Sequence, residues 1–79
     1  MAKFESKYLE RHKTNWTSGT SLIVTHNLGS EDVFVQIVDK NNNQLILVDV
    51  VEFTDVNTVT LTASEAPTGA GWRVMLLKL

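Results

Sequence analysis

Cysteine is absent from the 79-residue chain, which excludes disulfides and thiolate metal sites. Proline occurs once, and no apolar run approaches the roughly 20 residues that span a bilayer, so we predict no membrane insertion. A chain of this length forms one domain and buries only about 60–65% of its surface. Because disulfides are excluded, oligomerisation is the remaining common source of added stability, and we expect it here.

Residues that carry catalysis or bind metals are also sparse. The two histidines, His12 and His26, are separated by a turn and a strand, and no third ligand stands at a metal-site spacing. No serine lies in a Gly-x-Ser-x-Gly context, and no glycine-rich loop opens a helix. Asp49 and Glu52 fall on opposite faces of a predicted strand and therefore cannot form an acid/base pair through it. We predict a non-enzyme without metal or cofactor.

Charge is distributed unevenly along the chain, whose net charge is −2. The basic residues of the first part, Lys3, Lys7, Arg11 and Lys13, outnumber Glu5 and Glu10, whereas the remainder is acidic. A basic segment on an acidic body favours docking to a protein partner over binding of nucleic acid. Solvated charges at a chain terminus are the alternative interpretation.

Residues 21–39 contain two apolar runs separated by a reversal at His26, Asn27, Leu28 and Gly29. Asn27 and Gly29 tolerate a left-handed backbone, so we predict a hairpin there, with Leu28 pointing into the interior. His26 ends the first run without a chemical partner nearby, and we predict that a ring nitrogen bonds to backbone groups of the reversal. Two-residue alternation places Leu22, Val24 and His26 on one face of the first run. The second run has a wholly apolar face and a mixed face, as expected of a strand in a two-layer sandwich. The apolar face is Val33, Val35 and Ile37, and the mixed face is Phe34, Gln36 and Val38.

Three further strands are predicted after this hairpin. Residues 44–53 are apolar on both faces, which indicates cover by the facing sheet on one side and by another subunit on the other. Residues 58–63 place Val59 and Leu61 inward and threonines outward. Residues 72–79 also show two-residue alternation. Turn signals between short strands predict an all-β fold, a small antiparallel β-sandwich of five to six strands. The last strand sets Trp72, Val74 and Leu76 opposite Arg73, Met75, Leu77 and Leu79.

Residues 1–13 precede the predicted sandwich of residues 14–79. Their pattern suits either a helix or an edge strand, and charged residues of good helix propensity favour a short helix or an arm that orders on contact with a partner. We predict that this arm attaches the domain to a partner. Its candidate attachment residues are Phe4, Lys7, Tyr8, Leu9 and Arg11. Trp16 follows the arm and is expected to cover an edge of the sandwich.

The order of these motifs resembles a known module. The pattern T-H-N-L-G, then V-F-V-Q-I-V-D, a long apolar strand, T-D-V-N-T-V-T-L-T and a glycine-containing loop is similar to the small β-sandwich of tail-fibre, receptor-binding and other virion proteins of tailed bacteriophages. The likeness covers residues 16–77. Leu22 and Ala63 depart from the family, which usually carries an aromatic residue at both positions.

The resemblance implies a homotrimeric structural protein in a virion, with other virion proteins and host surface glycans as partners. Because the likeness starts close to Met1, we expect a compact piece attached to tail or head through residues 1–13, in a tail-fibre or decoration role, and not the tip of a long fibre. The alternative function is a small carbohydrate-binding module in which Trp16 or Trp72 stacks on a sugar ring.

Overall fold

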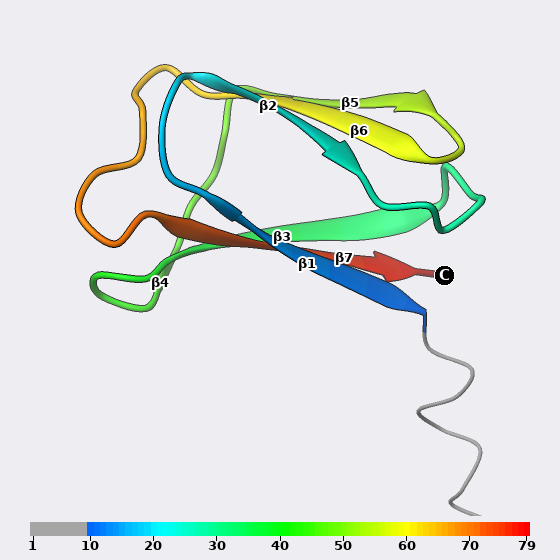
Figure 1. Ribbon diagram of the computed structural model, residues 1–79, viewed down its shortest axis with the longest axis horizontal. Coiled ribbons are helices and arrows are strands. Elements are labelled where there is room, and N and C mark those ends of the chain that lie inside the picture. Colours follow the sequence, from blue (N-terminus) through cyan, green and yellow to red (C-terminus); the bar gives the residue numbers. More distant parts are fainter. Residues whose placement is uncertain (1–9) are drawn as a thin grey trace, which may run out of the picture.

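The computed structural model describes residues 10–79, in which seven antiparallel strands and no helix form two facing sheets (Figure 1). The strands are β1 (Arg11–Trp16), β2 (Ser21–Thr25), β3 (Val33–Asp39), β4 (Gln44–Leu45), β5 (Val50–Asp55), β6 (Thr58–Thr62) and β7 (Trp72–Lys78). This confirms the predicted fold class, a small all-β sandwich, with one strand more than expected. Within these residues no helix has the length and apolarity to span a membrane.

One sheet has the order β1-β7-β3-β4 and the other the order β2-β6-β5. The strands β2 and β3 therefore lie in different layers, and the prediction that they form a hairpin is wrong. Instead β2 pairs with β6, and β3 pairs with β7 (Figure 1). Both β2 and β3 have an apolar inner face. In two facing sheets these inner faces cover each other, whereas in a flat hairpin they would lie side by side on one surface.

The predicted strand over residues 44–53 is interrupted because the chain changes sheet within it. Of this stretch, only β4 pairs with β3, and the pairs are Val38 with Leu45 and Asp39 with Gln44. Residues 46–49 then cross to β5 in the other layer. Along this crossing Ile46 and Val48 pack against the core, while Leu47 is 86% exposed. The core thus accounts for Ile46 and Val48. The other large apolar residues of the stretch stay exposed, and their cover by a second subunit stays a prediction; they are Leu45, Leu47, Val50, Val51 and Phe53.

The four-stranded sheet begins three residues earlier than the predicted domain boundary. All six residues of β1 pair with β7, from Arg11 opposite Leu77 to Trp16 opposite Trp72. Arg11, a predicted attachment residue, is therefore an exposed position of a strand. The other predicted attachment residues, Phe4, Lys7, Tyr8 and Leu9, lie outside the described residues.

The core lies between the two sheets and contains the wholly apolar face predicted for β3, the predicted inward positions of β6, and the β7 face that carries Trp72, Val74 and Leu76. Trp16 is fully buried and contacts Trp72 edge to face, with the ring centroids 5.0 Å apart. The Trp16 indole N–H donates to the carbonyl oxygens of Ser18 and Gly19, both at 3.0 Å. The prediction that Trp16 covers an edge is wrong, because the turn after β1 satisfies its only polar atom and so lets the ring enter the core. The remaining buried apolar residues are Val24, Val33, Ile37, Val59, Leu61, Ala63, Val74 and Leu76.

Candidate functional site

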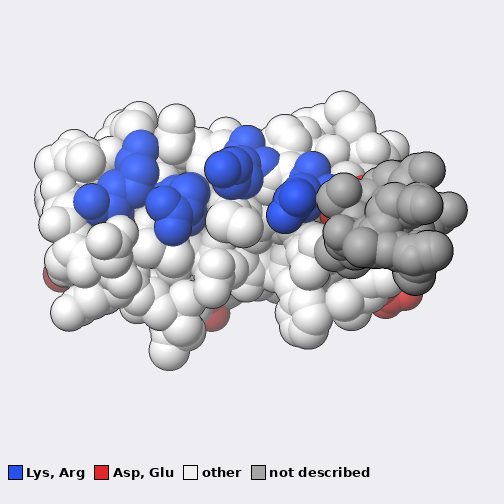
Figure 2. Space-filling view, turned by 90° about the horizontal axis from the view of Figure 1, so that it is seen from below, with Lys and Arg blue, Asp and Glu red and all other residues white. Residues whose placement is uncertain are grey.

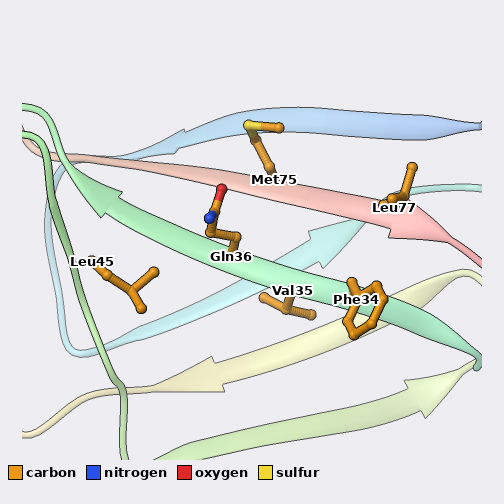
Figure 3. Close-up of a pocket in the computed structure, with 6 residues that line it drawn as sticks. All are labelled: Phe34, Val35, Gln36, Leu45, Met75 and Leu77. Atoms are coloured by element: carbon orange, nitrogen blue, oxygen red, sulfur yellow. The ribbon is translucent and has the colours of Figure 1, made fainter.

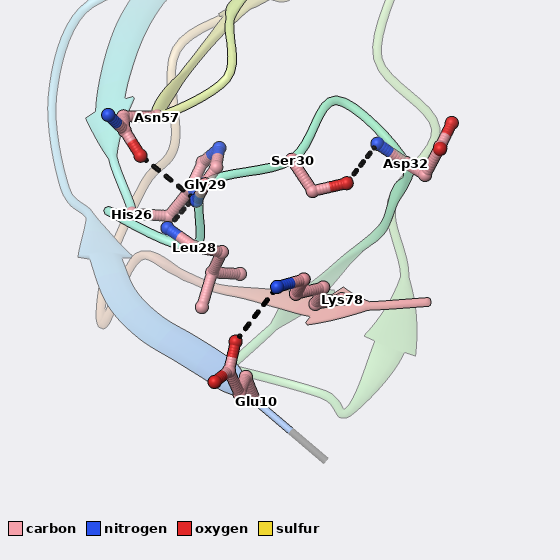
Figure 4. A network of polar contacts seen from close by, with 8 residues as sticks. All are labelled: Glu10, His26, Leu28, Gly29, Ser30, Asp32, Asn57 and Lys78. Carbon is pink, nitrogen blue, oxygen red and sulfur yellow. Dashed lines mark hydrogen bonds and ion pairs between the residues drawn. The ribbon is translucent and has the colours of Figure 1, made fainter. Parts of the chain in front are cut away.

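The predicted reversal at His26 to Gly29 connects the two layers. Asn27 and Gly29 both adopt a positive φ, of 56° and 69°, and Leu28 packs against the core, as predicted from the sequence. Nδ1 of His26 accepts the backbone N–H of Leu28 at 3.0 Å (Figure 4). This contact confirms the predicted bond between the ring and the backbone of the reversal.

The reversal is also tied to the turn between β5 and β6. The N–H of His26 donates to the carbonyl oxygen of Asn57 at 2.8 Å, and the N–H of Gly29 donates to Oδ1 of Asn57 at 2.9 Å (Figure 4). Asn57 in turn donates its N–H to Oδ1 of Asp55. The two most distinctive sequence motifs, His-Asn-Leu-Gly and the stretch that begins at Asp55, are therefore one hydrogen-bonded unit, and a structural requirement accounts for both.

His26 is only 4% exposed, and this environment disfavours its charged form. Burial lowers the pKa of the imidazole, the nearby His12 lowers it further, and Asp55 acts in the opposite direction. Because Nδ1 accepts a hydrogen bond, the neutral ring carries its proton on Nε2. Nε2 is buried and makes no hydrogen bond within the described part of the chain. The ring is thus suited to a neutral structural role.

Neither tryptophan presents a face for a sugar ring. Trp16 is 0% exposed and Trp72 is 8% exposed, and each ring packs against the other in the core. The glycan-stacking role proposed for these two residues from the sequence requires a solvent-facing ring. The structure places both on the opposite side of the sheet from solvent.

The outer face of the four-stranded sheet carries an apolar groove that the sequence did not lead us to predict. It has a volume of about 410 Å³ and is open to solvent. Figure 3 shows the six residues that line it. Phe34, which is 61% exposed, lies opposite Leu77, and Gln36 lies opposite Met75 on the neighbouring strand. Leu45 and Val35 also line the groove. The groove is open at this end because β4 pairs only with Val38 and Asp39 and leaves the edge of β3 unpaired from Val33 to Gln36.

Cations border this groove on the β1 side. Arg11 lies opposite Leu77, Lys13 opposite Met75, and Arg73 opposite Asn15. Lys40 extends the row, because its Nζ donates to Oδ1 of Asn15 at 3.1 Å. Figure 2 views the molecule from this side and shows a row of Lys and Arg side chains across the face, with acidic side chains only at its margin. The surface thus combines positive charge with exposed apolar area.

Other kinds of site have less support in residues 10–79. This part of the chain contains no group of three His, Asp or Glu side chains close enough to hold a metal ion. Its one ion pair joins Lys78 Nζ to Glu10 Oε1 at 3.3 Å, between partly exposed groups at the end of the sheet (Figure 4). Such a surface pair contributes little to stability. The groove and its cations are therefore the candidate site.

The arrangement defines a small β-sandwich with an amphipathic, cationic outer face. Comparison with protein-family models, with curated proteins and with solved structures finds no match to this chain.

The sequence contained a signal for the groove, but it is a weak one. The alternation in the sequence places Met75 and Leu77 on one face of their strand and Phe34 on the mixed face of its own strand. Only the pairing of β3 with β7 brings these residues together. Apolar residues on the outer side of two separate strands therefore become one surface through a contact between distant parts of the chain.

Proposed function

We propose that the protein is a non-enzymatic structural component of a tailed-bacteriophage virion, a homotrimeric β-sandwich held to a neighbouring virion protein through its N-terminal residues. The virion setting and the three-fold order rest on the resemblance of residues 16–77 to phage modules. The observation that carries self-association is the exposed apolar surface, and the proposal is independent of any catalytic or metal-binding residue.

Exposed apolar side chains are numerous for a domain of this size. Phe34 and Leu45 lie on the outer face of one sheet, and Leu47 lies on the crossing between sheets. Val50 and Phe53 add to this surface from β5, at the edge of the other sheet. Exposed apolar side chains at these two places are typical of interaction sites, and burial between copies would supplement a small core.

A carbohydrate-binding module, the second candidate function, loses the residues on which it was based. Both tryptophans are in the core, and the exposed aromatic side chains of residues 10–79 are Phe34 and Phe53. A glycan array, or titration with host surface polysaccharide, separates the two functions. Specific binding that Phe34→Ala abolishes would favour the carbohydrate-binding module over the structural role.

The virion role is tested by locating the protein in purified particles. We expect labelled protein to appear at a fixed place on the particle in electron micrographs. Absence from washed particles, together with free protein in the lysate, would overturn the proposed function.

The attachment role of the N-terminal residues needs a deletion that spares β1. Removal of residues 1–9 leaves every residue of β1 in place, whereas a truncation to Thr14 would remove half of the strand. We expect the shorter deletion to keep the fold and to reduce incorporation into particles. Incorporation at the wild-type level by a folded variant would contradict the attachment role.

A further inference from the structure

The two sheets carry opposite charge on their outer faces. The outward positions of the four-stranded sheet include Arg11 and Lys13 on β1 and Arg73 on β7, and no carboxylate lies among them. We call this surface, together with the groove between Phe34, Met75 and Leu77, the basic face. Its cations form no ion pair within the described residues.

The three-stranded sheet is acidic at one edge. Glu52 lies opposite Thr60, and Asp55 opposite Thr58, on the outer side of β6, and the exposed Asp49 precedes β5. No lysine or arginine occurs between Lys40 and Arg73, so residues 41–72 contain no basic side chain that could neutralise these carboxylates. We call Asp49, Glu52 and Asp55, with the exposed apolar residues Leu47 and Val50, the acidic edge.

The acidic edge lies on an edge strand, β5, that has a free side. β5 is the last strand in the order β2-β6-β5, so its outer backbone groups pair with no strand among the described residues. All six of its residues are exposed. An exposed edge strand with apolar side chains is a surface on which another chain can dock.

We infer that the acidic edge of one copy docks on the basic face of the next copy. Basic face on basic face would bring Arg11, Lys13 and Arg73 against the same cations, and two acidic edges together would oppose their own carboxylates. Only the contact between unlike surfaces joins opposite charges while it buries apolar side chains on both sides. Such a heterologous contact closes into a ring when the rotation between copies allows it. This inference rests on the proposed homotrimer and specifies how its subunits meet.

Charge reversal on each surface tests the docking mode. Asp49→Lys with Glu52→Lys reverses the acidic edge and leaves the turn contact of Asp55 with Asn57 intact. Lys13→Glu with Arg73→Glu reverses the basic face. We expect each pair of substitutions to weaken trimer formation by about tenfold or more in sedimentation equilibrium, since like charges then meet at every contact.

Combining all four substitutions gives the decisive variant. It restores the wild-type net charge of −2 and places opposite charges together again at the four substituted positions, with the signs exchanged. We expect it to recover trimer formation. Glu31→Lys with Asp32→Lys is the matched control, because it changes net charge as the acidic-edge variant does but lies in the exposed connection between β2 and β3. We expect this control to remain a trimer.

Circular dichroism establishes that each variant is folded, and the neutral pair Asp49→Asn with Glu52→Gln replaces an acidic-edge variant that fails to fold. A wild-type trimer that both reversals leave unchanged would overturn the docking mode and leave the proposed trimer standing. A folded four-substitution variant that stays monomeric, or a control that dissociates equally, would also overturn it. Trimers that assemble as expected but are absent from virions would overturn only the proposed function.

Discussion

The two sheets of the sandwich share one kind of inner face and differ on the outside. Inside, both supply apolar side chains to a single core. Outside, the four-stranded sheet has cations beside an apolar groove, whereas the three-stranded sheet has threonines and an acidic edge. Inner faces stabilise the fold, and outer faces determine what the folded chain contacts. A substitution should therefore affect stability or association according to the side of the sheet on which it lies.

The largest loss of stability is expected at Trp16. Trp16→Ala removes a fully buried ring, its contact with Trp72 and two indole hydrogen bonds. We expect the free energy of unfolding to fall by about 3–5 kcal/mol, measured by urea denaturation. Lys13→Ala, an outward position of the same strand, is the control, and it should change the unfolding free energy of the monomer in dilute solution by no more than about 0.5 kcal/mol. Similar losses for both would contradict the assignment of inner and outer sides.

A smaller loss is expected at the connection between the layers. His26→Ala leaves the N–H of Leu28 without its acceptor, and we expect the free energy of unfolding to fall by about 1–2 kcal/mol. Asn27→Gly, which preserves the left-handed conformation, should have a weaker effect. If His26→Ala left thermal stability intact but abolished binding to a partner, the residue would belong to a binding site instead.

The same histidine should make stability depend on pH. Burial lowers its pKa in the folded state, so the unfolded chain binds the proton more readily. Its contribution is complete above about pH 6.5, the ordinary value, and declines as the pH falls from there towards the lowered pKa. The slope reaches at most about 1.4 kcal/mol per pH unit. Denaturant unfolding at several pH values should show this slope in the wild type, and His26→Ala should remove it.

The smallest effect on unfolding is expected in the groove. Phe34→Gln changes a side chain that is largely exposed in one copy, so the unfolding free energy of the monomer in dilute solution should stay within about 0.5 kcal/mol of the wild type. Self-association should weaken because the basic face loses apolar area. Unchanged association of this variant would remove the groove from the proposed interface.

Alternation was enough to predict which residues share one face of a strand. Val33, Ile37, Val59, Leu61 and Val74 are all buried, and the left-handed conformations of the reversal followed from residue type. These properties are local, since a two-residue period is the same whatever strand lies alongside.

Pairing partners could not be predicted in the same way. The stretch over residues 21–39 looks alike in a hairpin and in a crossing between layers, and packing against β6 and β7 determines which one forms. The groove depends on that choice, because Phe34 meets Leu77 only when β3 lies beside β7. Similarly, the alternation of β1 was obscured by its charged residues, whose outward positions are compatible with an arm as well as with a strand.

Sedimentation equilibrium of the wild-type protein at micromolar concentration, over a series of salt concentrations, tests the central claim most directly. If unlike outer faces join the copies, the protein sediments at three times its chain mass of 8.8 kDa at low salt and dissociates progressively as salt screens the charges. A stable monomer at every salt concentration would contradict the account.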